Sequence, residues 1–165
     1  EAELLFMRAL KIWEEVLGPN HKGVAIIRDN LAVLYNYQGK YAEAEQIFIG
    51  DLEIFEETFG PNHEEVAWTC HNLANLYRDQ SKYSQAEPLY IRALKIRKEV
   101  LGPNHPDVAT TCKDLAELYR AQGKYAEAEP LYMRALKIRE EILGPDNPDT
   151  INTSSNIENL LKLKD

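Results

Sequence analysis

The sequence LGPNH at residues 101–105 decides the fold, because close copies of it stand at a constant spacing along the chain. The copies are LGPNH at 17–21, FGPNH at 59–63 and LGPDN at 143–147, so the step is 42 residues each time. The intervening segment repeats as well, since residues 83–108 match residues 125–150 at 18 of 26 positions. Chance similarity does not give this agreement, so the chain is an array of repeated units.

Each unit contains two amphipathic helices. In the first, Val108, Cys112, Leu115 and Tyr119 recur at spacings of four, three and four, which places them on one helix face. A second helical pattern follows in each unit and ends at a Gly-Pro or Gly-Pro-like stop. We expect the first helices at 24–38, 66–80, 108–122 and 149–163, and the second helices at 1–17, 42–59, 84–101 and 126–143.

One unit cannot bury its apolar stripe alone, so the units must stack on one another. We therefore predict an all-α fold, a right-handed α-solenoid of stacked antiparallel helix pairs, as a single array over residues 1–165. Its parts are a partial repeat at 1–17, repeats at 24–59, 66–101 and 108–143, and a C-terminal capping helix at 149–163. In that last helix Glu158 replaces Ala116 and Leu161 replaces Tyr119, which predicts a solvated cap. We expect Asp165 near the genuine C-terminus and the N-terminus cut inside the array.

Composition excludes several classes of function. The chain has 19 Lys and Arg against 27 Asp and Glu, and the net charge of −8 argues against nucleic-acid binding, which needs a basic face. No apolar run is long enough to span a bilayer, so no membrane partner is expected. Two cysteines in the whole chain fit a reducing compartment and predict a cytoplasmic location.

Short motifs inside the units resemble a known repeat family. Asn-Leu-Ala-x-Leu-Tyr at 72–77, Lys-Tyr-x-x-Ala at 82–86 and Ala93-Leu94 look like the tetratricopeptide repeat. A period of 42 with LGPNH between units resembles the kinesin light chain subfamily. The resemblance implies a superhelix whose first helices line a concave groove, and it implies that this groove binds an extended peptide segment of a partner protein, as in a cargo adaptor.

The positions that match the family's groove give a candidate peptide-binding set. Its members are Asn30, Asn36, Trp68, His71, Asn72, Asn75, Arg78, Lys113, Arg120, Asn156 and Asn159. Asparagine is frequent in this set, and its amide both donates and accepts, so it can bind a peptide backbone without reading side chains. The alternative interpretation is that these are ordinary exposed polar residues on helices.

Two further features suggest what the peptide carries. The kinesin light chain family takes peptides in which a tryptophan is flanked by acidic residues, and Arg78, Lys113 and Arg120 would offer partners for such carboxylates. Trp68 either stacks on an apolar anchor of the peptide or fills space between repeats. The resemblance thus implies an acidic ligand with an aromatic anchor.

The sequence predicts neither catalysis nor a cofactor. No nucleophile stands with a base and an orienting group at motif spacing, and no phosphate-binding loop or metal motif occurs. His21, His63 and His105 hold the same loop position in successive units, too far apart to share a metal ion, so we interpret them as structural. Cys70 and Cys112 are one period apart, beyond disulfide reach, and we interpret both as small buried residues.

A rival function is self-assembly of the array. Residues 42–66 hold eight acidic residues and no basic one, whereas residues 89–139 hold ten basic and six acidic, so opposite patches could steer association. Apolar surface for such contacts would come from Leu4, Leu5, Phe6, Trp13 and Phe55. The first full unit also has Asp51 where other units have alanine, and this carboxylate needs a donor or water, with Thr69 or His71 as candidate partners.

Overall fold

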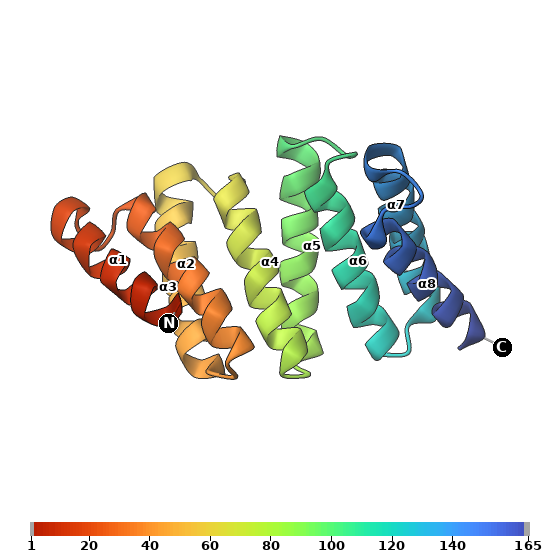
Figure 1. Ribbon diagram of the computed structural model, residues 1–165, viewed down its shortest axis with the longest axis horizontal. Coiled ribbons are helices and arrows are strands. Elements are labelled where there is room, and N and C mark those ends of the chain that lie inside the picture. Colours follow the sequence, from red (N-terminus) through yellow and green to blue (C-terminus); the bar gives the residue numbers. More distant parts are fainter. Residues whose placement is uncertain (1, 164–165) are drawn as a thin grey trace.

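The computed structural model describes residues 2–163, which form a row of eight α-helices without a strand in that range (Figure 1). The helices are α1 (Ala2–Leu17), α2 (Lys22–Tyr37), α3 (Tyr41–Phe59), α4 (Glu64–Asp79), α5 (Tyr83–Val100), α6 (Pro106–Ala121), α7 (Tyr125–Leu143) and α8 (Pro148–Lys162). The predicted all-α solenoid is thus confirmed. Glu1, which we placed in the first helix, and Asp165, which we placed near the C-terminus, lie outside the described residues.

The first helix of each full repeat begins two residues earlier than the predicted starts at 24, 66 and 108, because a histidine side chain caps it. The Nδ1 atoms of His21, His63 and His105 accept the backbone N–H two residues further on, at 3.1, 3.3 and 3.2 Å. Asn147 does the same at α8, with 2.9 Å from its Oδ1 to the N of Asp149. The periodic histidines therefore satisfy helix ends, which agrees with their structural interpretation.

The helices pack in chain order, and the first helices of neighbouring repeats also touch one another. In the described residues α2 contacts α4 and α4 contacts α6, whereas α3, α5 and α7 make no comparable contact among themselves (Figure 1). The row therefore curves with α2, α4 and α6 on its inner side. Small residues allow close packing of the helices, since Ala32, Ala74 and Ala116 hold one position in three repeats and are fully buried.

A polar contact with the same period ties each repeat to the one before it. The ammonium of Lys124 lies 3.1 Å from a carboxylate oxygen of Glu87 and 5.3 Å from the ring centre of Tyr119, whose hydroxyl also donates to Glu87. The pair Lys82 and Glu45 repeats this arrangement one unit earlier, at 3.9 Å. These contacts are half exposed, so they help to set the register between units rather than supply most of the stability.

The partner expected for Asp51 is wrong. Asp51 is buried, and its Oδ1 accepts a hydrogen bond of 2.9 Å from Nε of Arg28, while the hydroxyl of Thr69 donates to Asp29 instead. Arg28 lies on α2 of the same repeat, whereas the predicted partners lie on α4. A charged partner satisfies a buried carboxylate better than a hydroxyl does, which explains the choice.

The expectation of an exposed Phe55 is also wrong, because this ring is fully buried against Val66 and Ile96 in the core. Phe55 occupies the position of Arg97 in the next repeat, where the aliphatic stem of an arginine fills the same space. The apolar surface at α1 is present, with Leu4 75% and Leu5 65% exposed. At the other end, Glu158 is exposed as predicted for a solvated cap.

Candidate functional site

Two cavities lie between α2 and α4, on the inner side of the curve. The first, which we call the amide cavity, has a volume of about 100 Å³. Its lining residues are Val33, Asn36, Tyr37, Phe48, Asn72, Asn75, Arg78 and Asp79. Four of these belong to the predicted peptide-binding set, so the structure brings Asn36, Asn72, Asn75 and Arg78 together around one cavity.

The asparagines of the amide cavity are only partly used by the protein itself. Asn36 donates from Nδ2 to Asp79 at 3.0 Å, but its buried Oδ1 has no partner. Asn75 accepts from the Tyr90 hydroxyl at Oδ1, so its two N–H groups stay unused by the described residues. Asn72 donates to the carbonyl of Trp68 at 3.1 Å and keeps a free oxygen. The cavity therefore offers both unpaired acceptors and unpaired donors.

Arg78 brings a charge to the far wall of the same cavity. Its guanidinium lies 3.3 Å from Asp79, 3.5 Å from Glu117 and 3.7 Å from Asp114. Even so, its buried Nη1 makes no hydrogen bond of ordinary geometry. Arg78 is thus held in place by three carboxylates, and its Nη1 faces two of them as ion pairs.

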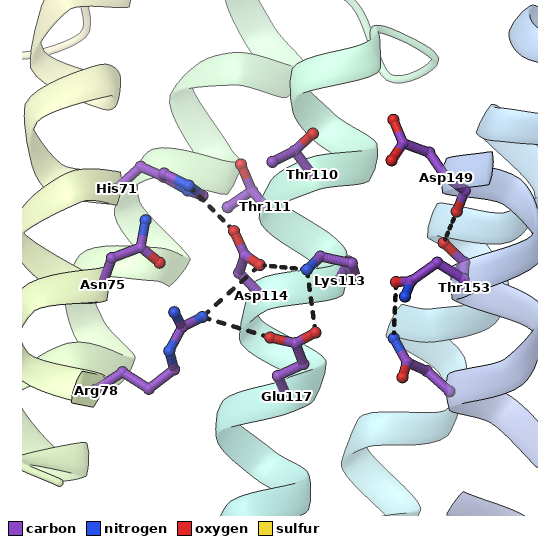
Figure 2. Close-up of polar contacts among 12 residues, drawn as sticks. His71, Asn75, Arg78, Thr110, Thr111, Lys113, Asp114, Glu117, Asp149 and Thr153 are labelled. Atoms are coloured by element: carbon purple, nitrogen blue, oxygen red, sulfur yellow. Dashed lines mark hydrogen bonds and ion pairs between the residues drawn. The ribbon is translucent and has the colours of Figure 1, made fainter. Parts of the chain in front are cut away.

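A buried polar network on α4 and α6 fixes that arrangement (Figure 2). Asp114 is its centre, at 3.2 Å from Nε2 of His71 and 3.0 Å from Nζ of Lys113. Burial alone would raise the pKa of the Asp114 carboxyl, but the hydrogen bond from His71 and the ammonium of Lys113 outweigh it and hold that pKa below its ordinary value. Burial lowers the pKa of His71, so the neutral ring donates to Asp114 at pH 7.

The network lowers the net positive charge on the inner face, because its carboxylates pair with Arg78 and Lys113. Lys113 also lies 3.0 Å from Glu117, and Arg78 is surrounded as described above. Two of the three cations that the sequence offered to an acidic peptide are therefore paired with carboxylates of the chain itself. His71 is only 6% exposed and supports Asp114 rather than facing solvent.

The second cavity, which we call the Trp68 cavity, has a volume of about 190 Å³. Its lining residues are Ile26, Asp29, Asn30, Glu65 and Trp68. Two members of the predicted set, Asn30 and Trp68, thus lie together here. Asn30 donates to the carbonyl of Ile26 at 2.8 Å, the contact that Asn72 makes one repeat later. Trp68 is half-buried and packs against the central core, as the space-filling interpretation required.

The remaining predicted residues lie outside both cavities. Arg120 and Asn159 are exposed on α6 and α8, and Asn156 donates to Asn152 on its own helix at 3.4 Å. Sequence reasoning missed Phe48, which lines the amide cavity from α3, Glu65, which lines the Trp68 cavity from α4, and Tyr90, which donates to Asn75. For Tyr90 the repetition of tyrosine at position 132 was a signal of a buried role, and for Glu65 the signal was its place three residues before Trp68 on the same helix face.

No group of three or more His, Cys, Asp or Glu side chains within residues 2–163 is arranged to hold a metal ion. Cys70 and Cys112 are free thiols buried in the core, which confirms their interpretation as small buried residues. No helix in the described part of the chain combines the length and apolarity that a membrane span requires.

Comparison with known proteins places the repeat pattern in a family. A sequence model of the tetratricopeptide repeat matches residues 1–49, 34–99, 71–141 and 112–165, which together cover the whole chain. The chain belongs to the tetratricopeptide repeat family. No curated protein sequence matches it.

Solved structures of the kinesin light chain kind share the fold. BtubC (BKLC) from P. vanneervenii is 27% identical, with a TM-score of 0.86 over 99% of this chain. This chain spans 65% of the BtubC chain. Two structures of a kinesin light chain-type protein with nearly identical TPR-like repeats, from Podosopora anserina, are 22% identical, with TM-scores of 0.81 and 0.80. Each covers 99% of this chain, which spans 77% and 78% of theirs. They confirm the resemblance to kinesin light chain-like repeats at the level of fold.

Proposed function

We propose that this tetratricopeptide repeat protein is a non-catalytic, cytoplasmic adaptor that binds an extended peptide segment of a partner protein along α2 and α4. The observation that carries the proposal is the set of unpaired polar atoms in the amide cavity. Oδ1 of Asn36 on the α2 wall lacks a donor, and the side-chain N–H groups of Asn75 on the α4 wall lack an acceptor among the described residues. Buried polar atoms without partners cost free energy, so a ligand that pairs them is favoured.

A peptide backbone has the chemistry that these atoms require. Its N–H can donate to Asn36, and its carbonyl can accept from Asn75 or Arg78. An amide group supplies the donor and the acceptor about one peptide unit apart, whereas a carboxylate supplies acceptors only and would leave Oδ1 of Asn36 unpaired. Recognition of the backbone also agrees with the recurrence of asparagine at one position, as Asn30, Asn72 and Asn156.

The acidic, tryptophan-containing ligand that the family resemblance implies rests on weaker support. Acidic residues of a peptide need free cations, and Arg78 and Lys113 already lie within 4 Å of Asp114 and Glu117. Arg120 is exposed at the surface of α6 and would have to supply most of the attraction. We therefore propose that the groove binds mainly the peptide backbone. The binding measurement then determines whether it prefers acidic peptides.

The test is retention of the chain on a peptide array that includes acidic tryptophan peptides. Replacing both Asn72 and Asn75 by alanine should weaken peptide binding by about 1–3 kcal/mol through the lost amide contacts. Because Asn75→Ala also leaves the Tyr90 hydroxyl unpaired, Asn36→Leu with Asn72→Ala is the second variant, and circular dichroism verifies helicity. Asn62→Ala, in an exposed loop, is the matched control. Equal retention of wild type and both variants would reject the groove.

Self-assembly is a second candidate, favoured by the apolar face of α1. Ile12, Trp13, Val16 and Leu17 surround a hollow of about 350 Å³, and Leu4 and Leu5 extend the apolar surface along the same helix. Exposed apolar patches of this kind mark association sites. Light scattering across protein and salt concentration separates the two candidates, since a monomer at every concentration would remove the assembly function and leave peptide binding untouched.

A further inference from the structure

The Trp68 cavity is lined by one carboxylate without a partner and by no cation, which restricts what can bind there. The carboxylate of Glu65 makes no hydrogen bond or salt bridge with the described residues. Asn30 uses one of its two N–H donors on the carbonyl of Ile26, so its oxygen and its second N–H are left for a ligand. Asp29 is buried, with one oxygen occupied by the Thr69 hydroxyl. No lining residue carries a positive charge.

The apolar part of the same cavity is a fixed aromatic wall. Trp68 packs against the central core, so its indole is held in place by its neighbours. Ile26 is 39% exposed and stands opposite on α2. A ligand side chain that enters meets an aromatic face, an aliphatic face and a carboxylate together, within a volume of about 190 Å³.

Resting on the proposed peptide groove, we infer that the Trp68 cavity receives an arginine side chain of the bound peptide. A planar guanidinium stacks on the indole of Trp68 while its N–H groups donate to Glu65 and Asn30, and the aliphatic stem contacts Ile26. The charge of the lining agrees, because it includes the carboxylate of Glu65 and no basic side chain. An acidic side chain would instead face the carboxylate of Glu65.

Other side chains satisfy less of the cavity. Lysine supplies the charge but no flat surface for the indole, so it should bind more weakly than arginine. Tryptophan fills the space but has a single N–H donor, which leaves the carboxylate or the Asn30 oxygen without a new partner. Arginine alone combines a flat cation with several donors.

The two cavities have a spacing that a single extended peptide can bridge. Asn30 and Asn36 are six residues apart on α2, which corresponds to about 9 Å along the helix. An extended chain advances about 3.3 Å per residue, so the arginine should lie about three residues from the backbone amide held in the amide cavity. Trp68 and Asn75 show a similar offset on α4.

The experiment selects random short peptides displayed on phage with three forms of the chain: wild type, Glu65→Gln and Glu64→Gln. Glu64 is exposed, in the same helical turn, and does not line the cavity, so Glu64→Gln removes an equal charge as the matched control. Wild type and the control should enrich arginine at one position of the aligned peptides. Glu65→Gln should still retain peptides, without that enrichment.

A direct titration then measures the arginine itself. In the selected peptide, arginine is exchanged for citrulline, which keeps the shape and removes the charge. This exchange should weaken binding to wild type by about 5- to 30-fold, the size expected for a partly desolvated cation on an aromatic ring and a carboxylate. The loss should be several-fold smaller with Glu65→Gln, as in a double-mutant cycle. With Trp13→Phe in the background, the emission of Trp68 should change only with the arginine peptide.

The outcomes separate this inference from the proposed function. If peptides are retained without arginine enrichment, or if citrulline costs the same in wild type and Glu65→Gln, the arginine site is wrong and the groove stands. Enrichment of acidic or tryptophan residues in its place would likewise overturn it. If no peptide is retained above the level of the double asparagine variant, the groove and the arginine site both fail.

Discussion

The first repeat and the two that follow it hold the same loop by different means. In the second and third repeats the arginine comes from the second helix: Arg92 donates to the carbonyl of Pro61 at 3.0 Å, and Arg134 donates to that of Pro103 at 2.8 Å. Alanine follows each arginine, at Ala93 and Ala135, and is fully buried. These joints bury no carboxylate beside the arginine.

In the first repeat the position of that arginine is Gly50, and the guanidinium comes from the other helix. Arg28 on α2 donates to the carbonyl of Pro19 at 3.0 Å, so the loop contact is preserved. Asp51 replaces the alanine and binds Arg28 at 2.9 Å. Three changes within one unit thus compensate one another, and the result is a buried carboxylate at a position where the other repeats have alanine.

This difference gives the first repeat a sensitivity to charge that the others do not share. Burial, together with the neighbouring Asp51, raises the pKa of Asp29 from 3.8 to about 8, against the hydrogen bond from Thr69. Burial also raises the pKa of Asp51, although Arg28 opposes the shift. Asp29 therefore keeps its proton at neutral pH, and one arginine balances the remaining carboxylate. Moving the arginine from the second helix to α2 thus makes the first repeat depend on the pairing of Arg28 with Asp51.

The largest effect should come from removing the arginine of the first repeat. Arg28→Ala leaves Asp51 buried without its cation, which should lower the free energy of unfolding by about 3–5 kcal/mol. Arg92→Ala removes a partly exposed arginine and should cost about 1 kcal/mol. Urea unfolding monitored by circular dichroism measures both. The triple variant Arg28→Cys, Gly50→Arg and Asp51→Ala gives the first repeat the residues that the second repeat has at these positions. It should restore most of the free energy of unfolding that Arg28→Ala loses, and failure to do so would refute the compensation.

The next effect is a dependence of stability on pH that belongs to Asp29. Because its folded pKa is above the unfolded value of 3.8, the native state binds a proton that the unfolded state releases. The free energy of unfolding should therefore fall as pH rises from about 4 to about 8. Asp29→Asn should flatten this part of the profile. A wild-type curve that rises through the same window would contradict the assignment.

A smaller effect on stability concerns the side chain that caps the first helix of a repeat. His63→Ala removes the side-chain acceptor at the start of α4 and should lower the free energy of unfolding by about 1 kcal/mol. His63→Asn should retain most of the stability, because Asn147 performs the same role at α8. Thermal unfolding of the two variants beside wild type provides the comparison, and equal losses would show that the ring, rather than its Nδ1 acceptor, matters.

The smallest effect concerns the turn inside each repeat. Gly39 and Gly123 hold this turn with φ of 75° and 73°, whereas the second repeat has Ser81 at φ 59°. A residue with a Cβ is strained there, so Ser81→Gly should raise the free energy of unfolding by up to about 1 kcal/mol, less the added entropy of the unfolded glycine. The same denaturation assay detects the gain, and a clear loss of stability would show that the serine is not strained.

Periodicity in the sequence was sufficient to predict the fold but not the pairing of polar groups. A 42-residue step and a four-three-four pattern determine helices and their stacking, because burial depends on residue type at fixed positions. The helix starts were missed by two residues because the capping by His21 and its equivalents depends on one ring nitrogen. Asp51 was noticed as a departure, yet its partner Arg28 could be identified only from the structure.

In the candidate site as well, the sequence predicted which residues come together but not which of their atoms remain unpaired. Asn36, Asn72, Asn75 and Arg78 were named from the repeat pattern, and the structure groups them around one cavity. Which of their atoms are unpaired depends on contacts with Tyr90, Asp79 and the carboxylates of α6, which lie far away in the sequence. The pattern gives positions on a helix face, and only the packed structure gives the remaining hydrogen-bonding capacity.

The most direct test of the peptide groove observes its amides while a peptide binds. The side-chain NH₂ signals of Asn36, Asn72 and Asn75 can be followed by NMR during titration with a peptide selected on the array, with the exposed Asn62 as internal reference. The account predicts that the Asn75 signals shift most, since their donors are unpaired in the free chain, while Asn62 stays unchanged. Binding that leaves all three groove signals in place, or that shifts only residues of α1, would contradict it.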